Sequence, residues 1–89
     1  MKEKLLSRLD RAITCVNAYD SDTIFNNKIE EIRRYARFIG GCDLKEIIQI
    51  TDETLSKPKH SPKEKEQITK KLCSIQEKIK KELFDCLSL

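Results

Sequence analysis

Histidine and cysteine are the residue types of this 89-residue chain best suited to catalysis or metal binding, and they are few. The single histidine, His60, stands in the Lys/Pro-rich stretch 57–61, with neither a carboxylate nor a cysteine beside it. A general base or an activated nucleophile usually needs a positioned histidine or a shielded carboxylate. We therefore expect His60 to be a solvated linker residue and the protein not to be an enzyme, with no catalytic residue and no small-molecule substrate.

The cysteines lack the close spacing that is typical of zinc sites. They stand at positions 15, 42, 73 and 86, and no two form a Cys-x-x-Cys pair. Without a secretory signal in the sequence, we expect four free thiols in a reducing compartment such as the cytoplasm. Cys42, which follows two glycines, is expected to be the most exposed and reactive, and Cys15, Cys73 and Cys86 to be core or half-buried residues. We expect no metal site and no cofactor.

One feature of the sequence suggests nucleic-acid binding. The residues around Ala36 and Gly40 have the order of a helix-turn-helix, which suggests a nucleic-acid-binding regulator using residues 30–56. However, the following helix would carry Asp43, Glu46, Asp52 and Glu53 against a single lysine, and carboxylates facing phosphates weaken binding. The net charge of +3 is also modest for such a protein. A nucleic-acid-binding regulator is therefore the alternative hypothesis for the function.

The elements that must position these residues are helices. Only two glycines and two prolines occur among 89 residues, and 37% of residues are charged. Apolar residues recur at helical spacing over about residues 2–19, 23–39, 43–56 and 62–88. The last helix opens with Ser61 as its cap, Pro62 at its first position and Glu64 at its third. We predict an all-α fold, a single domain over 1–89: a small four-helix bundle with short loops, a long C-terminal helix and no membrane span.

The end of the last helix is apolar on more than one side. Phe84 and Leu87 fall away from its main apolar stripe. Either the first helix covers them, or the terminus frays and leaves them exposed, or a partner covers them. We predict a non-enzymatic protein–protein interaction module, a small adaptor, chaperone-like or regulatory protein, whose partner is another protein or a second copy in a homodimer. The expected partner-binding residues are Phe84, Leu87 and Leu89, with Arg33, Arg34 and Arg37 as polar anchors. The simpler reading of these arginines is a solvated helix face.

Overall fold

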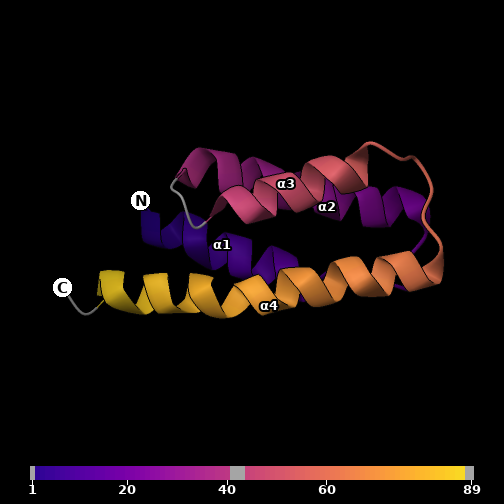
Figure 1. Cartoon of the computed structure of the whole chain (residues 1–89). Coiled ribbons are helices and arrows are strands. Elements are labelled where there is room, and N and C mark those ends of the chain that lie inside the picture. Colours follow the sequence, from indigo (N-terminus) through magenta and orange to yellow (C-terminus); the bar gives the residue numbers. More distant parts are fainter. Residues whose placement is uncertain (1, 41–43, 88–89) are drawn as a thin grey trace.

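The computed structural model describes residues 2–40 and 44–87, and their side chains except at positions 2, 82, 83 and 85–87 (Figure 1). The described chain is all-α, which confirms the predicted fold class. Its helices are α1 (Lys2–Thr14), α2 (Asp22–Ile39), α3 (Lys45–Leu55) and α4 (Pro62–Leu87). They run alternately up and down, so that α2 packs between α1 and α3, and α4 lies along α1 (Figure 1). The α3–α4 edge is the most loosely packed of the four.

Local signals in the sequence account for several helix ends. The Ser61 hydroxyl accepts a hydrogen bond from the Glu64 amide at 3.2 Å, and Ser21 caps α2 in the same way. Gly40 ends α2 with a φ of 69°, a left-handed conformation that glycine adopts without strain. Its amide donates to the Ala36 carbonyl at 3.0 Å. These caps fix both ends of α2 and the start of α4 through neighbouring residues alone.

The first helix is shorter than expected, ending at Thr14 instead of near residue 19. The side chain of Asn17 accepts a hydrogen bond from the Tyr19 amide at 2.9 Å, which turns the chain away from the helix. Val16, just before this turn, is buried, but Tyr19 is 80% exposed. The prediction of a first helix extending to about residue 19 was therefore wrong, because the helical spacing of apolar residues continues past the point where the helix stops.

All four helices contribute to one hydrophobic core. Its largest fully buried apolar side chains are Leu6, Leu9, Ile13, Phe25, Ile29, Ile32, Leu44, Ile47, Leu72 and Ile79. Helix α3 also places Thr51 and Thr54 at buried positions. Their hydroxyls donate to carbonyl groups of the same helix, at 2.8 Å and 2.7 Å, which offsets the cost of burying them.

Candidate functional site

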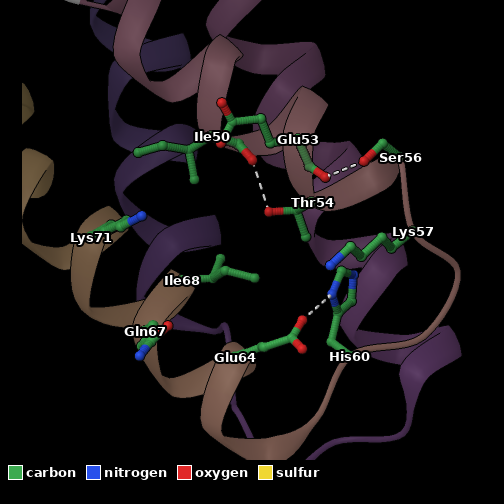
Figure 2. A pocket seen from close by; sticks show the side chains of 10 residues that line it. All are labelled: Ile50, Glu53, Thr54, Ser56, Lys57, His60, Glu64, Gln67, Ile68 and Lys71. Atoms are coloured by element: carbon green, nitrogen blue, oxygen red, sulfur yellow. Dashed lines mark hydrogen bonds and ion pairs between the residues drawn. The ribbon is translucent and has the colours of Figure 1, made fainter.

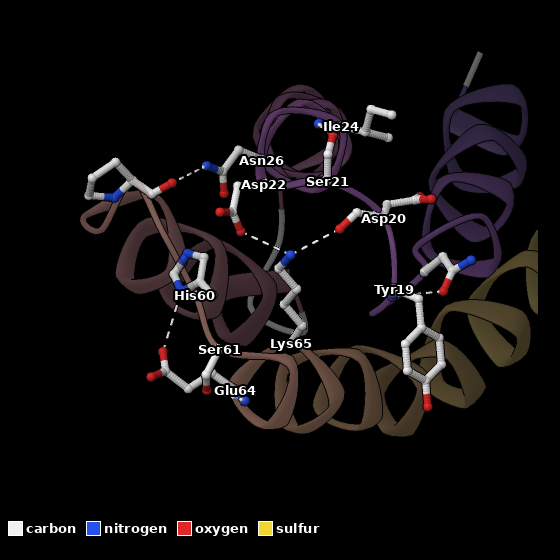
Figure 3. A network of polar contacts seen from close by, with 12 residues as sticks. Tyr19, Asp20, Ser21, Asp22, Ile24, Asn26, His60, Ser61, Glu64 and Lys65 are labelled. Carbon is white, nitrogen blue, oxygen red and sulfur yellow. Dashed lines mark hydrogen bonds and ion pairs between the residues drawn. The ribbon is translucent and has the colours of Figure 1, made fainter.

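A buried polar cluster fastens the start of α4 to the start of α2 (Figure 3). The Lys65 side chain, only 8% exposed, extends across the gap, and its Nζ lies 2.9 Å from Asp22 Oδ1. The same nitrogen donates to the Asp20 carbonyl at 2.9 Å and lies 5.5 Å from the centre of the Phe25 ring. The hydrogen bond from Lys65 holds the pKa of the Asp22 carboxyl below its usual value, and the His60 backbone amide acts in the same direction. Because this lysine is fully partnered, the cluster has a structural role.

His60 is part of this cluster, and the expectation of a solvated histidine was wrong. It is only 9% exposed, its ring centre lies 6.0 Å from that of Phe25, and its Nδ1 lies 3.5 Å from Glu64 Oε2. The Asn26 side chain holds the preceding loop by donating to the Pro58 carbonyl at 3.0 Å. Loop and helix thus fold over the ring together. Among the residues that the structure describes, none forms a hydrogen bond with His60 Nε2.

A shallow groove of about 450 Å³ runs along the loose α3–α4 edge, with His60 and Glu64 at one end (Figure 2). Ile50 and Ile68 form its apolar part, and polar and charged side chains line the rest. A histidine paired with a carboxylate can act as a base, but it needs a group to activate. The hydroxyls in this lining are already committed, since Thr54 donates to Ile50 and Ser56 donates to Glu53, both to backbone carbonyls.

Metal binding finds no support in the described part of the chain. Over residues 2–40 and 44–87, no three histidine, cysteine or acidic side chains come together as a metal site would require. Cys15 and Cys73 are exposed free thiols, so the expectation that they are core or half-buried was wrong. Cys15 follows the early end of α1, and Cys73 lies beside the buried Leu72 on the outer side of α4. Cys42 with its expected reactivity, and the side chain of Cys86, fall outside the described residues.

The predicted apolar anchors fall partly within the described residues. Phe84 is 70% exposed on the last turns of α4. The side chain of Leu87 and the whole of Leu89 lie outside the description. Phe38, which the sequence interpretation did not single out, is 73% exposed on the last turn of α2. Its position off the buried stripe of α2, one residue before Ile39, was the signal that could have identified it.

The predicted arginine anchors lie together on α2. Arg33, Arg34 and Arg37 line one shallow hollow with Glu30. Arg33 Nε lies 2.6 Å from Asp52 Oδ1 on α3, whereas the Arg34–Glu30 pair is a looser 3.8 Å. Helix α2 packs on α1 and α3, while Phe84 belongs to α4. The residues predicted as one binding site are therefore divided between α2 and α4, two helices that Lys65 joins at their starts but that pack mainly on other helices.

The helix-turn-helix alternative gains no support from this arrangement. Helices α2 and α3 lie side by side and antiparallel (Figure 1), whereas a recognition helix projects from its partner into the major groove. Asp52 on α3 is engaged by Arg33, and Glu46 lies 3.7 Å from Lys78 on α4. These two ion pairs join α3 to α2 and to α4.

Comparison with protein-family models, with curated protein sequences and with solved structures finds no match to this chain. Within the described residues, no helix is both long enough and apolar enough to span a bilayer. Any functional conclusion therefore depends on the surfaces of the bundle itself.

Proposed function

We propose that this protein is a non-enzymatic protein-interaction module that binds a partner protein at the end of the bundle where α2 and α4 terminate. The observation that carries the proposal is the pair of exposed phenylalanines, Phe84 at 70% and Phe38 at 73%. Figure 1 shows that both helices finish at the same end of the molecule. Exposed aromatic side chains of this size are typical anchors of protein interfaces.

The end of α4 supports this reading. Ile79 is its last residue that the structure describes as buried, and Phe84 follows five positions later. At 1.5 Å per residue, the Phe84 backbone lies about 7.5 Å further along the helix axis. Among the α4 side chains that the structure describes, none beyond Ile79 belongs to the core. A partner that covers Phe84 would remove from water an apolar side chain that the fold leaves exposed.

The expected contribution of these two rings to binding is substantial. Burying one phenylalanine that was fully exposed is worth about 1.5–3 kcal/mol. Each factor of ten in affinity corresponds to about 1.4 kcal/mol, so losing both rings should weaken binding by about 100-fold or more. Association also costs translational and rotational freedom, so the buried area does not give the affinity itself. The difference in affinity between the wild type and the variant is therefore the quantity to measure.

The test compares the wild-type chain with a Phe38→Ser, Phe84→Ser double variant. Light scattering at several concentrations gives the solution mass, and affinity purification gives the partner protein that is retained. Tyr19→Ser is the control for removing an exposed aromatic ring elsewhere, because Tyr19 is 80% exposed in the connection that precedes α2, where its hydroxyl donates to Glu66. We expect the double variant alone to lose self-association or the retained partner. An unchanged mass together with unchanged retention would reject the proposed function.

A further inference from the structure

The chain separates its two kinds of basic residue. All five arginines lie between positions 8 and 37, on α1 and α2, whereas ten of the thirteen lysines follow residue 40. Arginine differs from lysine in having a planar guanidinium that binds phosphate or carboxylate through two parallel hydrogen bonds. A surface that only faces water is served equally well by lysine and by arginine. The α1–α2 side of the bundle therefore has a composition suited to recognising an anion.

The arginines line a continuous series of shallow hollows along α2. The first, of about 230 Å³ between α1 and α2, is lined by Arg8, Arg11 and Lys28 among others. It shares Tyr35 with a second hollow, of about 350 Å³. That one shares Arg34 with the third, of about 170 Å³. We call this surface the arginine face, and its cations are Arg8, Arg11, Lys28, Arg33, Arg34 and Arg37.

Most of these cations are free to bind a ligand. Within the described part of the chain, no carboxylate lies within ion-pairing distance of Arg8, Arg11, Lys28 or Arg37. The hollows themselves are lined by six cations and by two carboxylates, those of Glu30 and Glu31, and Asp52 of α3 pairs with Arg33. Cations that converge without counter-charges repel one another, and a bound anion relieves that repulsion.

We propose that the arginine face binds single-stranded nucleic acid, with Arg8, Arg11 and Arg37 contacting phosphates and Tyr35 stacking on a base. Lys28 and Arg37 are nine residues apart on α2, which is about 14 Å along the helix axis and about half a turn around it, so a bound strand would cross the solvent-facing side of the helix between them. Tyr35 is half-buried and lines two of the three hollows. A base can stack on such a ring, whereas a duplex offers no unstacked base and an acidic peptide has none.

This inference does not rest on the proposed function, because it uses neither Phe38 nor Phe84. Fluorescence anisotropy with a labelled oligouridine probe measures the binding directly. For single strands the slope of log K against log salt is about −0.7 per phosphate contact, so three contacts predict about 20-fold weaker binding between about 50 and 200 mM salt.

Variants assign the binding to this surface. We expect Arg8→Gln with Arg11→Gln to weaken binding at least 10-fold and to flatten the salt dependence, and Tyr35→Leu to weaken it about 5-fold or more. Lys70→Gln with Lys80→Gln is the matched control, since it removes the same charge from exposed positions of α4. We expect this control to bind like the wild type.

Three results would overturn the proposal. The first is no binding of the oligouridine at low salt with protein at high micromolar concentration. The second is a loss in the α4 control equal to that in the arginine variants, which would indicate attraction by overall charge. The third is equal or tighter binding of a duplex or of a polyglutamate peptide, which would assign the arginine face to another class of ligand.

Discussion

Replacing Leu72 by alanine tests the packing of α4 on the rest of the bundle. Leu72 is fully buried near the middle of the helix. The substitution removes three carbon atoms, worth about 0.8 kcal/mol each, and leaves a cavity whose cost is added. We expect a loss of about 3 kcal/mol in the free energy of unfolding. For a domain of this size, that loss lowers Tm by about 12–24 °C.

Two neighbouring positions supply the controls for this prediction. Ile68 is half-buried beside the α3–α4 groove, so Ile68→Ala should cost about 1 kcal/mol, less than Leu72→Ala. Cys73 is exposed, so Cys73→Ala should change stability by less than about 0.5 kcal/mol. Urea unfolding followed by circular dichroism measures all three. A cost below about 1 kcal/mol for Leu72→Ala, or an equal cost for Cys73→Ala, would mean that α4 presents another face to the core.

The remaining predictions concern the two N-terminal helix ends that meet near Lys65. The Asp22 carboxyl has a folded-state pKa below its ordinary value of 3.8, so its stabilising effect is present above that pH and is lost as the pH falls through the lower, folded pKa. The difference in free energy of unfolding between the wild type and Asp22→Asn should therefore shrink as the pH is lowered from neutral to about 3. Urea unfolding at each pH measures this difference, and a constant or growing value would contradict the prediction. Ser61→Ala should lower the free energy of unfolding by about 1 kcal/mol, because it removes the cap of α4. Ser74→Ala, at an exposed position within the helix, should change it little. Equal effects of the two substitutions would show that the cap contributes nothing.

The parts of the fold that the sequence predicts well are those set by neighbouring residues. Ser61, Pro62 and Glu64 define the start of α4 within a single turn, and Gly40 ends α2 by its own backbone conformation. The early end of α1 escaped prediction because Val16 continues the apolar spacing after the helix has stopped. What decides that end is the Asn17 side chain, whose preference for a turn competes with the helical pattern around it.

The burial of His60 could not be read from its neighbours in the sequence. A Lys/Pro-rich loop is ordinarily solvated, and what covers this histidine is Phe25, which lies 35 positions earlier in the chain. Lys65 is similar, because its partners Asp20 and Asp22 belong to another helix end. The one local signal was the spacing of four between His60 and Glu64, which places both on one side of the turn that begins α4. Long-range packing supplies the rest.

The arginines of α2 differ in how far they are engaged in the fold, and this bears on the proposed binding surface. Arg33 is engaged with Asp52 at 2.6 Å and is only partly exposed, so it joins α2 to α3. Such a pair near the surface contributes about 0–1 kcal/mol, and a ligand that recruits Arg33 must first break it. Arg37 is exposed, and no described carboxylate pairs with it. Arg33→Gln should therefore lower stability more than Arg37→Gln, and Arg37→Gln should lower nucleic-acid affinity more than Arg33→Gln. A reversed order would mean that the pairing in the free protein does not decide which arginine meets the ligand.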